Sequence, residues 1–232
     1  YMINETTYLE KVQAVSEDSS VVEKKMVDFQ RTWVFWENYL TTEENRNTNN
    51  ENKDKDWNAQ IKKVFSFSDL ITFWQFWNSY PGSNPKDLFY DGDRFMLFFE
   101  SRKRIDGLNL FAENISPKWE DSQNAGGRIF QLQYDIKKDL DEFLEFIKDY
   151  WLKLVLFLIG ESLPCSHLVN GIRFVDKSKP KQKILYRIEI WISSAYKTEE
   201  NIRDYSLNDL KDFLKKNFGS DVDDKPINPI GH

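Results

Sequence analysis

Segments in which apolar and polar side chains alternate constrain the fold of this chain more than any other feature. Asp28–Trp36 alternates around Trp33 before it becomes fully apolar, and Arg128–Tyr134 alternates throughout. A period of two predicts strands with one buried side and one polar side, which is typical of antiparallel sheets. Similar patterns predict the remaining strands at Lys63–Phe67, Leu108–Phe111, Val169–Val175 and Lys183–Ser193, the last two of which form a hairpin.

Three segments have apolar residues at helical spacing. Ser68–Trp77 begins with capping residues, and Asp139–Glu161 is the longest segment with one broad apolar face. Ser206–Phe218 is followed by Gly219, a residue that often ends a helix. Because helices and alternating strands are intermingled along the chain, we expect an α+β fold in which helices cover one face of an antiparallel sheet.

Composition excludes several classes of protein. The 232 residues suit one domain, and the net charge of −6 argues against bulk electrostatic binding of nucleic acid, although a small basic pocket remains compatible with it. The single cysteine, Cys165, excludes an intramolecular disulfide and favours a reducing compartment. No motif suggests a metal or a cofactor. Cys165 and His167 have no third catalytic group beside them in the sequence, so we expect no enzyme.

Local composition predicts the limits of the domain. Residues 1–28 are polar and acidic and are expected to be a flexible N-terminal segment. The domain itself is expected at 29–219, with an insertion around 81–107, and residues 220–232 are expected to be a charged tail. Neither a signal peptide nor an apolar run of membrane-spanning length is visible in the sequence.

Eight tryptophans are an unusual number, and their sequence contexts divide them. Four lie in apolar periodic segments and are expected in the core or at its edge: Trp33, Trp36, Trp151 and Trp191. Trp57 instead follows residues 41–56, which contain no apolar side chain, and Trp119 is flanked by charged residues. We expect these two tryptophans to be exposed and available to a ligand.

Several motifs, in this order, resemble one known family. Trp119-Glu-Asp121, Gly126-Gly-Arg128 and Leu158-Ile-Gly-Glu161 are weak signals separately but specific in combination. The other matching segments are Trp33-Val-Phe-Trp36, Trp57-Asn-Ala59, Phe73-Trp74, Pro117-Lys118 and Ile190-Trp191. Together they resemble the eukaryotic translation initiation factor 4E family over roughly residues 31 to 218. The resemblance implies a curved antiparallel β-sheet backed by three helices on its convex face, and binding of the messenger RNA cap.

The cap base carries a positive charge because its guanine is methylated at N7. The resemblance implies that Trp57 and Trp119 hold this ring between their indoles, where cation–π attraction favours the methylated base. It also implies that Glu120 accepts hydrogen bonds from both N–H donors on the edge of the guanine.

The triphosphate of the cap needs cations. The resemblance implies phosphate binding by Arg128, after its two glycines, and by Arg187, four residues before Trp191. Lys177 and Lys179, in the hairpin loop, fall near the family's other phosphate-binding positions. This loop is longer than is usual in the family, which leaves the register of the two lysines open, and a solvated charge run is the alternative.

A second surface is implied for partners. The matching residues are Trp74 on the first helix and Leu152 and Leu156, which are four residues apart on one face of the second helix. In the family this surface binds an amphipathic helix from a scaffold factor or a repressor. Lys153 stands where the family has an acidic residue, which predicts a different partner motif or a lower affinity.

The resemblance therefore implies a monomeric, non-catalytic initiation factor without cofactors. Its partners would be capped messenger RNA and a scaffold protein, with no membrane, and its location the cytoplasm with the nucleus as a second compartment. A repressor that binds the cap without the scaffold remains an alternative. A cap-processing enzyme is less favoured, because it would need a carboxylate cluster for a metal or a nucleophile with its base.

Overall fold

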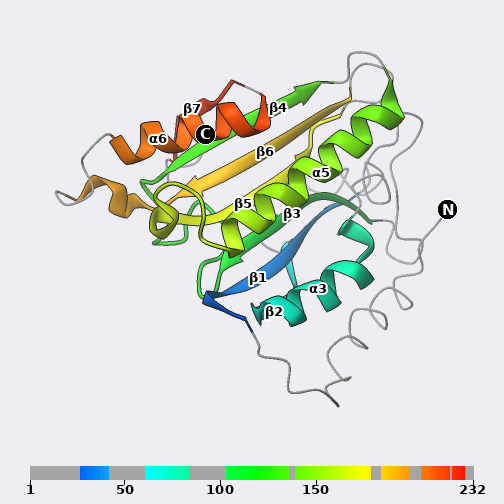
Figure 1. The fold of residues 1–232 in the computed structure, drawn as a ribbon, viewed down its shortest axis with the longest axis horizontal. Helices are drawn as coiled ribbons and strands as arrows, with labels where there is room; N and C mark the ends of the chain where they lie inside the picture. Colours follow the sequence, from blue (N-terminus) through cyan, green and yellow to red (C-terminus); the bar gives the residue numbers. More distant parts are fainter. Residues whose placement is uncertain are drawn as a thin grey trace, which may run out of the picture.

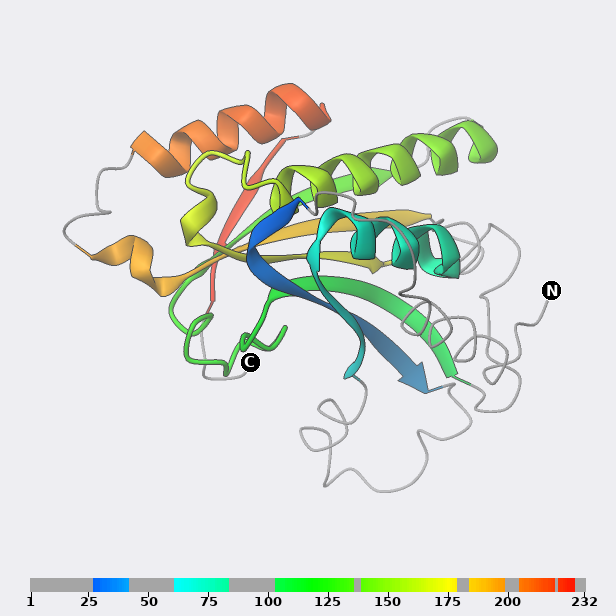
Figure 2. The ribbon, with the colours of Figure 1, turned by 60° about the horizontal axis from the view of Figure 1, so that its bottom comes forward.

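The computed structural model describes residues 27–41, 61–83, 103–135, 139–178, 184–198, 205–219 and 221–227. Seven strands form one antiparallel sheet in the order β2-β1-β3-β5-β6-β4-β7, and three helices lie on the same face of it (Figures 1 and 2). The strands are β1 (Asp28–Thr41), β2 (Ile61–Asp69), β3 (Lys103–Ala112), β4 (Arg128–Asp135), β5 (Val169–Asp176), β6 (Leu185–Ile192) and β7 (Asp223–Pro226). The curved sheet with helices on its convex face confirms the expected fold class.

The three helices begin and end where local chemistry favours it. In α3 (Leu70–Ser79), the Asp69 carboxylate accepts a hydrogen bond from the Thr72 backbone N–H. Asp139 caps α5 (Leu140–Ile159) in the same way. These caps satisfy backbone N–H groups that have no partner within the helix. Beyond α6 (Tyr205–Phe218), Gly219 has a φ of +59°, a conformation that favours glycine and ends the helix.

Two segments differ from their sequence interpretation. The expected insertion around 81–107 ends just before the strand expected at Leu108, yet β3 already begins at Lys103, because Tyr39, Leu40 and Thr41 at the end of β1 provide partners for this stretch. Residues 220–232 are expected as a tail, yet Asp223–Pro226 forms β7 against β4. This pairing covers the edge of β4 that would otherwise be unpaired. Residues 84–102, which make up most of the expected insertion, lie outside the described residues.

The core lies between the sheet and the helices. Alternate strand residues such as Leu110, Phe130 and Ile190 are fully buried in the same core cluster as Trp151 and Leu154 of α5. A separate small cluster of Phe111, Trp191 and Ile227 contains no helix residue. Because successive strand residues face opposite sides, this cluster marks the concave face of the sheet.

The last motif of the resemblance contributes to this fold. Glu161 follows α5 and accepts a hydrogen bond of 2.6 Å from Arg31 Nε on β1. The same guanidinium donates to the backbone oxygens of Val169 and Ser166. Glu161 therefore anchors the end of α5 to the sheet. None of the helices in the described ranges is both long enough and apolar enough to span a bilayer.

Candidate binding site on the concave face

Strand register arranges the concave face into rows that cross the sheet. The apolar row consists of Val34, Phe111, Gly171, Trp191 and Ile129. The polar row consists of Trp36, Asn109, Arg173, Glu189 and Gln131. The third row, which contains Arg187, consists of Asn38, Gly107, Val175, Arg187 and Gln133. Adjacent rows are two residues apart along each strand, which corresponds to about 7 Å.

The loop between β3 and β4 leaves the sheet beside the apolar row, and in Figure 2 it lies on the side away from the helices. Its backbone is fixed by its own polar side chains. The Asp121 carboxylate accepts from the backbone N–H and hydroxyl of Ser116 and from the Gln123 N–H. Asn124 is fully buried and donates to the carbonyls of Ser116 and Lys118, each at 2.8 Å. These bonds hold residues 116–124 in one conformation.

The same loop is tied to the sheet. Asn170, at the start of β5, donates to the Gln123 carbonyl at 2.8 Å and to Asn124 Oδ1 at 2.9 Å. A Cβ atom on Gly127 would lie 2.1 Å from the Ile192 carbonyl oxygen, so only glycine fits there. Gly126 has a φ of +76°, which also favours glycine. Glycine is therefore required at Gly127 by the close approach of the Ile192 backbone and favoured at Gly126 by its positive φ.

Trp119 and Glu120 lie on this fixed loop with their side chains exposed. The exposed fraction of Trp119 is 38 %, which is unusual for so large an aromatic residue. Within the described ranges no aromatic contact of Trp119 and no hydrogen bond of Glu120 is present. The structure thus gives Trp119 the exposure that its polar flanks predict. Trp57 lies outside the described residues, and so does the geometry of the expected tryptophan pair.

Of the four cations expected at the phosphates, the structure brings two together. The pKa of Lys177 is lowered by burial of its ammonium and by the positive charges of Arg187 and Arg173, although part of the side chain stays exposed. Arg187 lies directly opposite Val175 on the neighbouring strand, two residues before Lys177. Lys179 lies outside the described residues.

Arg173 completes this basic cluster of Arg173, Lys177 and Arg187, and sequence reasoning did not select it. It lies in the polar row with only 8 % of its side chain exposed. The sequence feature that could have indicated Arg173 as a site residue is a charged side chain within the otherwise apolar Ile172–Val175 segment. Its alternation places it on the face opposite Ile172 and Phe174, which are core residues.

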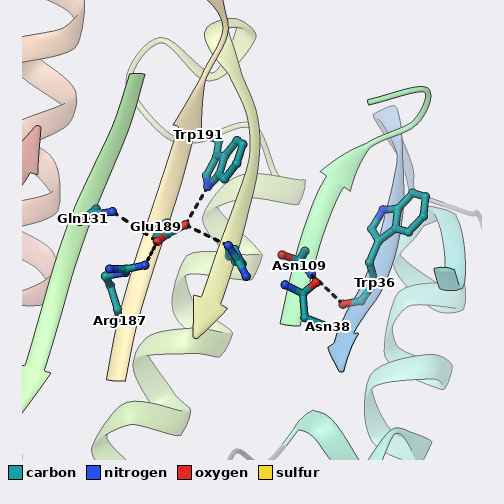
Figure 3. Close-up of polar contacts among 8 residues, drawn as sticks. Trp36, Asn38, Asn109, Gln131, Arg187, Glu189 and Trp191 are labelled. Carbon is teal, nitrogen blue, oxygen red and sulfur yellow. Dashed lines mark hydrogen bonds and ion pairs between the residues drawn. The ribbon is translucent and has the colours of Figure 1, made fainter. Parts of the chain in front are cut away.

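One carboxylate lies inside the basic cluster. Glu189 Oε1 is 2.7 Å from Arg187 Nη2, and Oε2 is 4.0 Å from Arg173 Nη1 (Figure 3). Gln131 Nε2 donates to Oε1 at 3.4 Å and Trp191 Nε1 donates to Oε2 at 3.1 Å. The carboxylate therefore accepts from both cationic and neutral donors at the centre of the concave face.

Arg128 is not part of the cluster. Its Nε donates to Asp224 Oδ1 at 2.6 Å, and Lys211 of α6 contacts the other oxygen of Asp224 at 2.6 Å. Burial would raise the pKa of Asp224, but the hydrogen bonds from these two cations lower it overall. Arg128 shares its side of β4 with Phe130, which faces the helices.

The ladder also separates Arg128 from Arg187. Gln133 of β4 lies opposite Arg187, and Arg128 is five residues before it, which corresponds to about 17 Å along the strand. The structure therefore does not bring Arg128 together with the basic cluster. The face of the sheet on which Arg128 lies, and its distance from Arg187, depend on strand register. The glycines before Arg128 contain no information about that register.

The expected partner residues lie on the helices at the convex face. Trp74 and Leu152 are half-buried, and Leu156 is one of the few exposed large apolar side chains in the described residues, with an exposed fraction of 36 %. Lys153 donates to the Asn217 carbonyl at the end of α6 at 3.1 Å and lies 5.3 Å from the centre of the Phe218 ring. Its charge is thus engaged within the protein.

The cysteine and histidine pair lacks the features of a nucleophilic site. Burial, together with the charge of Asp209, raises the pKa of the Cys165 thiol to about 12. The thiol is therefore protonated near neutral pH and is a weak nucleophile. In the described part of the chain, no three side chains among His, Cys, Asp and Glu are grouped as metal ligands would be.

Comparison with known proteins agrees with this architecture. The model of the family "Eukaryotic initiation factor 4E" matches residues 28–219. Eukaryotic translation initiation factor 4E of Candida albicans is 31 % identical over 141 residues, which cover 60 % of this chain and 56 % of that protein. The Dictyostelium discoideum protein of the same name is 27 % identical over 187 residues, covering 80 % and 59 %. The chain thus spans less than two thirds of these relatives.

Solved structures share the fold. The schistosome factor complexed with m7GpppG and 4E-BP superimposes with a TM-score of 0.59 at 16 % identity, covering 88 % of this chain and 90 % of that one. The Caenorhabditis elegans factor 4E-3 in complex with the 4E-binding protein Mextli gives a TM-score of 0.57 at 22 % identity, covering 83 % and 86 %. The family model, however, covers most of this chain, from the first strand to the end of α6. The chain therefore belongs to the eukaryotic initiation factor 4E family.

Proposed function

We propose that this chain binds the 7-methylguanosine cap of messenger RNA without chemical turnover. The observation that carries the proposal is the hydrogen-bonded β3–β4 loop, which presents an exposed Trp119 next to an exposed Glu120 that makes no hydrogen bond to another described residue. Stacking on one aromatic face contributes about 1–3 kcal/mol per base, and a rigid loop avoids the entropic cost of ordering. Trp57 is proposed as the second stacking face.

The phosphates are proposed to extend from this loop toward the basic cluster. Arg187 keeps 23 % of its side chain exposed and Lys177 is exposed beyond it, so both can reach an anion above the concave face. Lys179 is proposed to follow them in the hairpin loop. Arg128 lies on the helix side of β4, where it is paired with Asp224, and it is therefore not proposed to contact the phosphates.

A titration with cap analogues tests the proposal. We expect 7-methylguanosine triphosphate to quench tryptophan fluorescence with an affinity about tenfold or more above that of GTP, since only the methylated ring carries the charge that attracts indoles. Trp119→Ala should remove most of the quenching caused by either nucleotide, and Trp119→Phe should retain part of the binding. Equal affinities for the two nucleotides would contradict the cation–π sandwich, and release of a nucleoside diphosphate would indicate an enzyme.

We further propose that the convex face binds an amphipathic helix through Trp74, Leu152 and Leu156, and that the chain acts as an initiation factor. Lys153 is the residue that favours the alternative of a repressor that does not engage the scaffold. Its ammonium donates a hydrogen bond to the Asn217 carbonyl at 3.1 Å, which directs it toward the end of α6. The schistosome structure with the same fold was solved in complex with 4E-BP.

The partner surface has its own test. Leu156→Glu should weaken binding of a scaffold-derived helical peptide by about tenfold or more, because an exposed apolar anchor becomes charged. Phe146→Glu is the matched control, since Phe146 is 40 % exposed on the same helix ten residues earlier. Calorimetry would measure both variants. Equal losses in the two would mean that the peptide does not bind at Leu156.

A further inference from the structure

The position of Glu189 is fixed by the sheet. It lies in the middle of β6, and its side chain is only 3 % exposed. Arg173 of β5 and Gln131 of β4 are its direct partners in the two ladders. A side chain with this burial and these cross-strand neighbours stays within the concave face, so its carboxylate is a fixed part of that surface (Figure 3).

The donors that converge on Glu189 are those that a phosphate oxygen would use. Arginine binds carboxylates and phosphates with the same fork of N–H groups. The 2.7 Å contact with Arg187 therefore occupies one of the donors that the proposed ligand needs. A phosphate that approaches Arg187 also meets the charge of the carboxylate at close range, which reduces the attraction.

The cluster nevertheless keeps some capacity for an anion. Arg187 Nε is buried and makes no hydrogen bond to any described residue. The charges of Arg187 and Arg173 still lower the pKa of Lys177, after the larger effect of burial, while Asp106 and Glu189 act in the opposite direction. Three cations thus face two carboxylates, and the net positive charge is small.

We propose that Glu189 determines phosphate specificity at this site. By acting as a built-in anion between Arg173 and Arg187, it makes the second and third phosphates of the ligand contribute little, so that recognition depends mainly on the methylated base. This inference rests on the proposed cap binding. It assigns to Glu189 a role in selectivity rather than in stability alone.

The test compares 7-methylguanosine monophosphate with the triphosphate. For the wild-type chain, we expect the triphosphate to bind less than about tenfold more tightly than the monophosphate. Glu189→Gln should enlarge this ratio at least about tenfold and make triphosphate binding more sensitive to salt, because the arginines are released from the carboxylate. An unchanged ratio would overturn the inference while leaving cap binding intact.

Two control variants separate local charge from other effects. Glu145→Gln changes the net charge by the same amount but at an exposed pair with Lys148 on α5, and it should keep the wild-type ratio. Glu189→Asp keeps the charge with a shorter side chain and should also keep a small ratio. An Asp variant that behaves like Glu189→Gln would show that the charge is not the determinant, which would overturn the inference.

Inorganic tripolyphosphate provides a readout that does not depend on the cap. Its binding should raise the melting temperature of Glu189→Gln more than that of the wild-type chain, because the anion takes the place of the missing carboxylate. The same comparison decides the case if Glu189→Gln folds poorly, since rescue by tripolyphosphate supports the inference and no rescue contradicts it. If the wild-type chain bound no cap analogue, the proposed function would fail, and this comparison would still test Glu189.

Discussion

Glu120→Ala is expected to bind 7-methylguanosine triphosphate about 100-fold more weakly than the wild-type chain. The proposed contact consists of two hydrogen bonds from the guanine edge to the Glu120 carboxylate, and the substitution removes both. Each such charged bond contributes about 1.5–3 kcal/mol when well formed. Glu120 is exposed before binding, so solvent screening reduces this total, and about 3 kcal/mol, or roughly 100-fold, is a reasonable expectation. Calorimetric titration would measure the loss.

Glu120, rather than its neighbour, is expected to carry this effect because the two acids are used differently. The Asp121 carboxylate is engaged by Ser116 and by the Gln123 N–H, and it holds the loop together. Glu120 has no such bond to a described residue and remains available to a ligand. An isosteric Glu120→Gln should be nearly as harmful as Glu120→Ala, because its amide would direct a donor at a guanine donor.

Glu113→Gln is the control for Glu120, since Glu113 is an exposed acid at the start of the same loop. It should keep the wild-type affinity within a factor of about two. Comparable losses at both positions would mean that the general charge of the loop, and not a specific contact, attracts the ligand.

Gly127→Asn is expected to lower the free energy of unfolding by at least about 3 kcal/mol, which places it among the severe single substitutions. A Cβ atom there would meet the Ile192 oxygen at 2.1 Å and the Asn124 oxygen at 2.8 Å. Both are backbone atoms, so neither can move without breaking the β4–β6 ladder or the loop. Denaturant unfolding would measure the change, and cap affinity should fall with it because the loop carries Trp119.

The adjacent glycine provides the matched control. Gly126 has a positive φ but open space around its Cβ position, where the nearest atom is the flexible Lys197 Nζ at 3.5 Å. Asparagine tolerates this backbone conformation, so Gly126→Asn should cost about 1 kcal/mol or less. If the two variants were equally stable, the close approach of Gly127 to β6 would not be the constraint that the structure indicates.

Most of the fold could be predicted from local sequence patterns. The alternation of Arg128–Tyr134 gave β4, and the long apolar face of Asp139–Glu161 gave α5, each to within two residues. The errors lie at the segments without a strong pattern. β7 could not be predicted because Asp223–Pro226 has no alternation of apolar and polar residues, and it is a strand only because β4 offers an edge.

The candidate site was predicted less evenly. The exposure of Trp119 follows from its charged neighbours, which is a local property. The grouping of cations is not local. Arg128 and Arg187 were expected together, yet they lie on opposite sides of the sheet, while Arg173 and Glu189 were not selected although they are paired directly across β5 and β6.

The sequence by itself determined the strands β1 to β6, the helices with their caps, and a polar loop that carries Trp119 and Glu120. Only the tertiary structure decided which charges share the concave face. The physical reason is strand register: a shift of one residue moves a side chain to the other face of the sheet, and register is set by contacts between distant segments. The burial of Glu189 between Arg173 and Arg187, and the pairing of Arg128 with Asp224 on the helix side, both follow from that register.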